Sequence, residues 1–185
     1  MRSTLNLLSA ALLSSFLFFR PATSAAPPQA PPEPQPQSAK SAACSAPEYR
    51  QFDFWVGDWD AFDVDTHVKS ARNHVDSILD GCVIREDYEQ NDGMHGESFS
   101  IYDASRKVWH QSWVTNRGVL LIIEGTWKDG QMTLEGADHP QPGVERRVRG
   151  IWKPQGNGVR ETAVTSTDGG KTWKPWFDIL FLPHK

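Results

Sequence analysis

The chain has 185 residues, with 19 lysines and arginines against 23 aspartates and glutamates, which gives a formal net charge of −4. This acidic balance argues against nucleic-acid binding, because neutralising phosphates requires a basic face. A hydrophobic content of 38% is too high for a disordered chain and too low for several membrane spans. Two cysteines exclude a four-cysteine zinc site and a disulfide-dense miniprotein. The length predicts one domain with tails.

Residues 1–26 have the features of a secretory signal peptide. Arg2 precedes an apolar run over residues 5–19, and small residues follow that run. The run has about 15 residues, whereas a membrane-spanning helix needs roughly 20. We therefore expect cleavage after Ala25 or Ala26, export to the periplasm or the extracellular medium, and no stable membrane span after processing. A retained membrane anchor is the alternative.

Residues 27–43 contain six prolines and no aromatic residue. Proline restricts φ and lacks a backbone donor, so this segment is expected to be an extended, disordered linker. The folded domain is then expected to span residues 44–185, which is long enough for one sizeable core.

Short β-rich runs separated by Gly, Asp and Asn turns fill this domain. The runs follow one another at spacings of roughly 8–14 residues, which is typical of antiparallel all-β folds. Residues 73–79 fit either a strand or a short helix. Residues 119–127 are apolar on both faces, which predicts a strand buried on both sides or closing on itself. We expect about ten strands in one up-and-down antiparallel β-barrel, because closure removes exposed edges; a two-sheet sandwich is the alternative.

A nine-residue string, F-D-F-W-V-G-D-W-D, occupies residues 52–60. Its Gly57-x-Trp59 step resembles the opening motif of lipocalins and other calycins. The longer string, together with D-G-C-V-I-R-E at residues 80–86 and the Y-D…W-H-Q-S-W-V segment at residues 102–114, resembles a set of bacterial secreted proteins that have no assigned activity.

This resemblance covers roughly residues 44–177 and implies a lipocalin-like β-barrel. In lipocalins the motif tryptophan plugs one end of the barrel, and an arginine of a late strand packs over it; Arg149 or Arg160 would do so here. Trp59 is expected to be structural, with an acceptor for its indole N–H. Gly57 is expected to let the chain bend tightly as it enters the strand.

Cys44 and Cys82 are the only cysteines of a chain that is expected to be exported, and pairing them is the economical interpretation. The bond would close a loop of 39 residues, computed as 82 − 44 + 1. Chain entropy predicts a stabilisation of about 4 kcal/mol for such a loop.

Residues 166–173 match the S-x-D-x-G-x-T-W pattern of the Asp-box hairpins in sialidase propellers. A propeller needs several four-stranded blades, which a domain of this length cannot supply. We therefore interpret the segment as the last hairpin turn, in which Asp168 accepts hydrogen bonds from turn N–H groups and Trp173 covers them.

The histidines show no spacing that is typical of a metal site. No HxH, HExxH or CxxC pattern joins His67, His74, His95, His110, His139 and His184. We expect no metal and no cofactor; a long-range metal site joining His95 and His110 is the alternative.

Alternation along two strands predicts a pocket inside the barrel. Glu86 and Tyr88 share one face of their strand, and Trp109, Gln111 and Trp113 share one face of another. Aromatic walls with a few convergent polar groups are typical of small-molecule sites. An acid in such a pocket can have a raised pKa. The alternative is that Glu86 and Gln111 form a buried hydrogen-bonded pair or point outward.

The leading hypothesis is an exported protein that binds a small apolar or amphipathic molecule in this lumen. A second hypothesis is a small barrel hydrolase or isomerase that uses Glu86 with His95 or His110. A third is a carbohydrate-binding or interaction module with an exposed platform of Trp173 and Trp176. The sequence assigns no catalytic residue and no oligomeric state.

Overall fold

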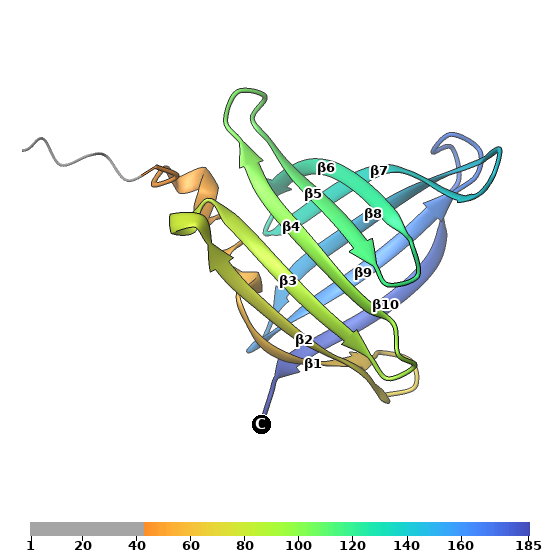
Figure 1. Cartoon of the computed structure of the whole chain (residues 1–185), viewed down its shortest axis with the longest axis horizontal. Coiled ribbons are helices and arrows are strands. Elements are labelled where there is room, and N and C mark those ends of the chain that lie inside the picture. Colours follow the sequence, from red (N-terminus) through yellow and green to blue (C-terminus); the bar gives the residue numbers. More distant parts are fainter. Residues whose placement is uncertain (1–42) are drawn as a thin grey trace, which may run out of the picture. The chain divides into compact units, whose positions relative to one another are not determined.

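The computed structural model describes residues 43–185. Within them, ten antiparallel strands form a closed up-and-down barrel, which confirms the predicted fold class (Figure 1). The predicted signal peptide, residues 1–26, and nearly all of the predicted linker, residues 27–43, lie outside the described part. None of the helices within residues 43–185 has the length and apolarity that a membrane crossing would require.

The strands follow the chain order around the barrel, and each pairs with its sequence neighbours. They are β1 (Gly57–Asp63), β2 (Lys69–Ile78), β3 (Val83–Gln90), β4 (His95–Asp103), β5 (Val108–Thr115), β6 (Leu120–Lys128), β7 (Gln131–Gln141), β8 (Val144–Gln155), β9 (Gly158–Ser166) and β10 (Lys174–Pro183). The described chain also has three short helices, η1 (Pro47–Arg50), η2 (Asp53–Trp55) and η3 (Leu79–Gly81). Residues 73–79, which fitted a strand or a helix, lie mostly in β2. The barrel closes where β1 pairs with β10, from Trp59 opposite Pro183 to Asp63 opposite Ile179.

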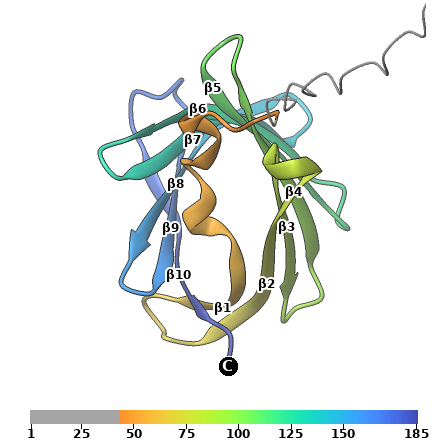
Figure 2. The ribbon, with the colours of Figure 1, turned by 90° about the vertical axis from the view of Figure 1, so that its left-hand side faces the viewer.

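Aromatic side chains from the segment before β1 fill one end of the barrel. The Phe52 ring lies 5.7 Å from the ring of Trp109 and 5.6 Å from that of Trp152, and Trp55 lies 4.6 Å from Phe181. Phe52 and Trp55 are both fully buried. Figure 2 shows η1 and η2 leading into β1 between the two sides of the barrel. Each such aromatic pair contributes about 0.5–1.5 kcal/mol beyond its buried area, so this end is firmly closed. We call Phe52 and Trp55 the plug.

Trp59 packs beside the plug and orients it. Its indole stacks on that of Trp55 at 6.1 Å, and its Nε1–H donates a hydrogen bond of 2.9 Å to the Trp55 carbonyl. A Cβ at Gly57 would lie 2.6 Å from the Trp59 ring, so the glycine allows close packing of the indole.

The two arginines that the resemblance suggested over Trp59 have other partners. Arg149 lies 4.0 Å over the ring of Trp173. The guanidinium of Arg160 pairs with the carboxylate of Asp178.

Side chains alternate between the lumen and the outer surface along each strand. In β6, Leu121 and Ile123 are buried, whereas Leu120 and Ile122 are 59% and 46% exposed. Of the two alternatives predicted for this segment, burial on both faces is therefore wrong, and a strand of a sheet that closes on itself is what the structure has. A single closed layer has only its inner face to bury apolar side chains, so the outward ones of β6 stay on the surface.

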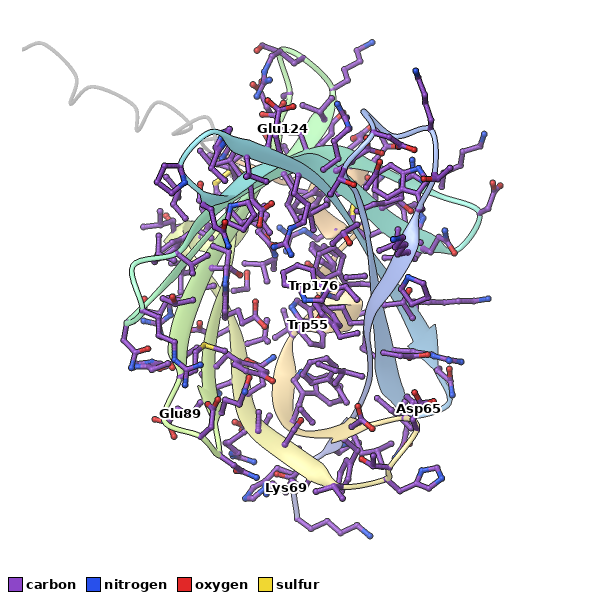
Figure 3. All side chains as sticks on the ribbon, turned by 90° about the vertical axis from the view of Figure 1, so that its right-hand side faces the viewer. Trp55, Asp65, Lys69, Glu89, Glu124 and Trp176 are labelled. Carbon is purple, nitrogen blue, oxygen red and sulfur yellow. A yellow bond between two sulfur atoms is a disulfide. The ribbon has the colours of Figure 1, made fainter. Side chains whose placement is uncertain are left out.

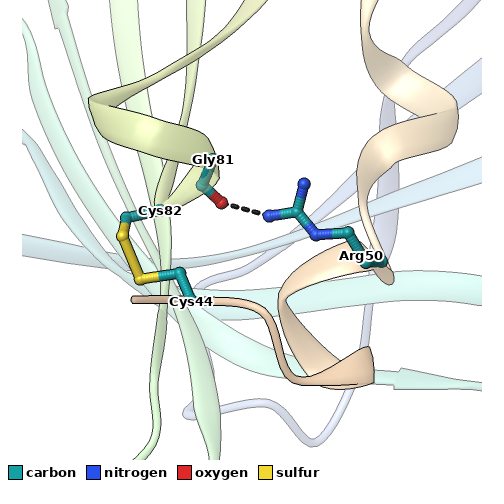
Figure 4. Close-up of a disulfide and its surroundings, with 4 residues drawn as sticks. All are labelled: Cys44, Arg50, Gly81 and Cys82. Atoms are coloured by element: carbon teal, nitrogen blue, oxygen red, sulfur yellow. Dashed lines mark hydrogen bonds between the residues drawn. A yellow bond between two sulfur atoms is a disulfide. The ribbon is translucent and has the colours of Figure 1, made fainter. Parts of the chain in front are cut away.

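The disulfide between Cys44 and Cys82 is present, as predicted (Figure 4). Cys82 directly precedes β3, so the bond attaches the segment before η1 to the strand that carries Glu86. Arg50 reinforces this attachment by donating a hydrogen bond to the carbonyl of Gly81.

The last hairpin turn is organised by Asp168. Its Oδ1 accepts hydrogen bonds of 2.9 Å from the backbone N–H groups of Lys171 and Thr172. The Trp173 indole donates to the carbonyl of Gly170 at 3.0 Å. The turn is thus held by the local contacts that such a motif predicts.

Replacing Cys44 and Cys82 by serine should lower the free energy of unfolding by about 4 kcal/mol, because the unfolded chain regains the freedom of the loop. Urea unfolding followed by tryptophan fluorescence measures the change. Reducing the native disulfide is the control and should give a similar loss; equal stability of the oxidised, reduced and serine forms would contradict the prediction.

Gly57→Ala should destabilise the protein by about 1–3 kcal/mol, because its methyl group overlaps the Trp59 ring. The same urea assay applied to a double-mutant cycle with Trp59→Leu isolates this contact. The cost of the alanine should shrink in the leucine background, and an undiminished cost would place the strain elsewhere.

Candidate ligand-binding site

A cavity of about 690 Å³ lies inside the barrel and opens at the end opposite the plug. Turns that follow β3 and β5 contribute to its rim. Figure 3 views the barrel from this end: Trp55 lies inside the ring of strands, whereas Glu89 and Asp65 lie outside it. The apolar part of the lining includes Trp113, Leu121, Ile123, Trp152, Phe177 and Ile179.

A buried hydrogen-bond network crosses four neighbouring strands on one wall. Glu86 Oε1 accepts a hydrogen bond of 3.0 Å from Asn73 Nδ2, and Oε2 accepts one of 2.8 Å from Ser98 Oγ. Gln111 Nε2 donates to Ser98 Oγ at 3.4 Å and to Ser100 Oγ at 3.1 Å. All five residues are buried. Ser98 therefore connects Glu86 to Gln111, which were expected either to line a pocket or to pair with each other.

The Glu86 carboxyl group has a strongly perturbed pKa. Burial raises it from 4.5 to about 7, since the barrel interior solvates a carboxylate poorly. The hydrogen bonds from Ser98 and Asn73 favour the carboxylate and oppose this rise, while the nearby charge of Asp87 adds to it. Near neutral pH the group is therefore poised between its charged and neutral forms.

Glu161 is a second acid that lines the cavity. It lies on β9 directly opposite Trp152 of β8. Burial raises the pKa of Glu161 well above its usual value, the charge of Glu86 raises it further, and the Trp152 indole opposes the rise. Among the described residues, neither Glu86 nor Glu161 forms an ion pair with a basic side chain.

The two arginines of the lining already have acidic partners, while His139 of β7 also belongs to the lining. Arg146 pairs with Asp138 and lies 4.5 Å over the ring of Trp176. Arg117 pairs with Asp92 at 3.0 Å. The cavity therefore presents uncompensated carboxyl groups beside neutralised guanidinium groups.

The structure brings four of the five predicted ligand-binding residues to the cavity. They are Glu86, Tyr88, Gln111 and Trp113, and the rings of Tyr88 and Trp113 lie 6.0 Å apart.

Trp109, the fifth, lies outside this cavity. It packs on Phe52 and donates a hydrogen bond of 3.1 Å to Gln51 Oε1, beside a smaller cavity of about 140 Å³. Trp109 and Trp113 share a face of β5, but four residues of extended chain separate them by about 13 Å along the strand. Although they share a face of the strand, only Trp113 reaches the larger cavity.

Sequence reasoning missed Asn73, Ser98, Trp152 and Glu161. For Glu161 a signal was present, because Val159 and Ala163 share its face of β9 and are buried. No local signal showed that this face lines the same cavity as Glu86.

The histidines of the enzyme hypothesis point away from the cavity. His95 Nε2 lies 2.7 Å from Asp87 Oδ1, and His110 Nδ1 lies 2.9 Å from Glu124 Oε1. Asp87 follows Glu86 in β3 and therefore faces outward. Neither histidine converges with Glu86, because the sheet lies between them.

Asp87, His95 and Glu97 hold their potential ligand atoms within 4.8 Å of one another. This cluster is on the outer face and does not include His110. It is separate from the cavity, and the predicted alternative of a site joining His95 and His110 gains no support from it.

Trp173 and Trp176 do not present a shared open platform. Trp173 is half-buried beneath Arg149. Trp176 is 46% exposed, but it lies at the rim of the cavity, where Arg146 and Phe177 contact its ring.

No protein-family model matches this chain, and no curated protein matches it either.

Glu86→Gln should change how stability depends on pH. The folded protein keeps the Glu86 proton up to about pH 7, while the unfolded chain releases it near pH 4.5, so the wild type loses stability as the pH rises between these values. Relative to the variant, the loss should be about 3 kcal/mol. Urea unfolding across this pH range measures it.

Glu89→Gln is the matched control, since Glu89 is exposed on the same strand. This variant should follow the wild type at every pH. Parallel curves for the wild type and Glu86→Gln would show that Glu86 ionises normally in the folded protein.

Proposed function

We propose that this protein binds a small apolar or amphipathic molecule in the lumen of its barrel. The cavity of about 690 Å³ carries the proposal. Small-molecule sites occupy about 300–1,000 Å³, with mostly apolar walls and a few placed polar groups. Protein interiors are otherwise close-packed, with few voids larger than a water molecule, so a hollow of this size in a domain with such a well-packed plug favours a binding role.

The walls and the polar groups of the cavity support an amphipathic ligand. Trp113, Leu121 and Phe177 offer apolar contact, while Glu86 and Glu161 offer polar contact. Hydrogen bonds from Asn73 and Ser98 hold the Glu86 side chain in place, so it loses little side-chain entropy on binding.

We further propose that the protein acts outside the cytoplasm, as a lipocalin-like binding protein. The disulfide supports export, because such bonds persist in oxidising compartments. The signal-peptide features of residues 1–26 agree with it. The G-x-W step beside the plug and the up-and-down barrel support the likeness to lipocalins.

Nile red, a neutral dye that fluoresces in apolar surroundings, should bind the full-length protein with a marked rise in emission. Ala163→Phe should reduce this binding by about tenfold or more, because Ala163 is buried on the cavity wall and a phenyl group there takes up space the dye needs. Fluorescence titration of both proteins measures the change. Val164→Phe, on the opposite face of β9, is the matched control and should bind as the wild type does.

A second control separates the lumen from the outer surface. Ile122→Ser removes an exposed apolar side chain of β6. Dye binding that survives Ala163→Phe but is lost in Ile122→Ser would place the dye on the outside and contradict the proposal.

A further inference from the structure

We propose that the lumen selects ligands that carry a protonated amine, which binds between Glu86 and Glu161 while its apolar part contacts the aromatic walls. This inference rests on the proposed function and specifies the chemical class of its ligand.

The hydrogen bonds around Glu86 all run toward its carboxyl group. Gln111 donates to Ser98, Ser98 donates to one oxygen of Glu86, and Asn73 donates to the other. Such an arrangement favours the carboxylate over the neutral acid. Several buried donors therefore stabilise the Glu86 carboxylate, although burial by itself disfavours this charged form.

No described residue supplies the counter-charge. The groups around Glu86 are Asn73 of β2, Tyr88 of β3, Ser98 of β4 and Gln111 of β5, and the charges of Asp87 of β3 and Glu161 of β9 interact with it; none of them is basic. In the rest of the lining, Arg146 is neutralised by Asp138 and Arg117 by Asp92, and the remaining basic side chain is His139 of β7. A buried carboxylate without an ionic partner is energetically unfavourable, so a cationic ligand gains binding free energy by pairing with Glu86.

The unpaired polar atoms also favour a donor-rich ligand. Each oxygen of Glu86, which lines the cavity, accepts one hydrogen bond from a described residue and retains a lone pair; Asn73 Oδ1, which is not part of the lining, is a further buried acceptor without a partner among the described residues. The Trp152 indole N–H is a buried donor opposite Glu161; it has no partner within hydrogen-bond distance, but it is close enough to favour the Glu161 carboxylate. Acceptors thus exceed donors, and an ammonium group brings three donors and no acceptor.

One positive charge fits the pair of acids. The charge of Glu86 adds to the rise in the pKa of Glu161, which disfavours ionisation of both acids at once, so the pair carries at most about one negative charge. Tyr88 and Trp113 line the same space, and their rings add cation–π attraction to an ammonium group.

Three probes of equal chain length test the inference by displacing Nile red from the full-length protein: octylamine, octanol and octanoate. At about pH 8 octylamine should bind about tenfold or more tightly than octanol, and octanoate should bind most weakly, because it would bring a second anion to Glu86. Lowering the pH to about 5.5 should weaken octylamine binding, since Glu86 takes up a proton, and should leave octanol binding unchanged.

Glu86→Gln should bring the affinities for octylamine and octanol to within a factor of about two and abolish the pH effect. Glu161→Gln should weaken octylamine binding without affecting octanol. Glu89→Gln makes the same chemical change on the outside of β3 and should preserve the preference for the amine. Retained octanol binding shows that each variant has folded and kept its cavity.

The outcomes separate this inference from the proposed function. Equal binding of octylamine and octanol by the wild type, or an amine preference that Glu86→Gln leaves intact, would overturn the amine inference while lumen binding stands. If Nile red and all three probes fail to bind the lumen, the proposed function fails and the amine inference fails with it.

Discussion

The pairing of β1 with β10 is the interaction on which the rest of the structure depends. It joins residues more than a hundred positions apart and converts a row of strands into a ring without free edges. Closure gives every residue of a strand a definite side, because alternate side chains must then face the lumen or the solvent. The buried network around Glu86 exists only because four successive strands turn the same set of faces inward.

The plug decides what the closed ring contains. A barrel of ten strands encloses more space than one of eight, whose interior side chains just fill it. Phe52 and Trp55 occupy this space at one end, with Trp109 and Trp152 packed against Phe52. Within residues 43–185 no comparable segment enters the opposite end, and the cavity lies there. The segment that precedes β1 thus determines which end of the barrel is filled by side chains and which end holds the cavity.

Much of the candidate site could be predicted from the sequence because the period of a strand is strictly two. Alternation alone placed Glu86 with Tyr88 on one face of a strand and Gln111 with Trp113 on one face of another, and the structure shows that both faces line the cavity. It failed for Trp109 because alternation gives the side of the sheet and not the depth along the barrel. Alternation also failed to exclude His95 from the site. It gives the face of a residue only relative to other residues of the same strand, so the outward orientation of His95 became clear only from its contact with Asp87.

The sequence by itself determined the features that depend on neighbours along the chain: the order of strands and turns, the hairpin around Asp168, and the pairing of the only two cysteines. The tertiary structure alone decided that Glu161 shares a cavity with Glu86 and that the outward side chains of β6 have no covering layer. The physical reason is that turns and alternation arise from local backbone geometry, whereas these arrangements depend on the register and curvature of all ten strands together.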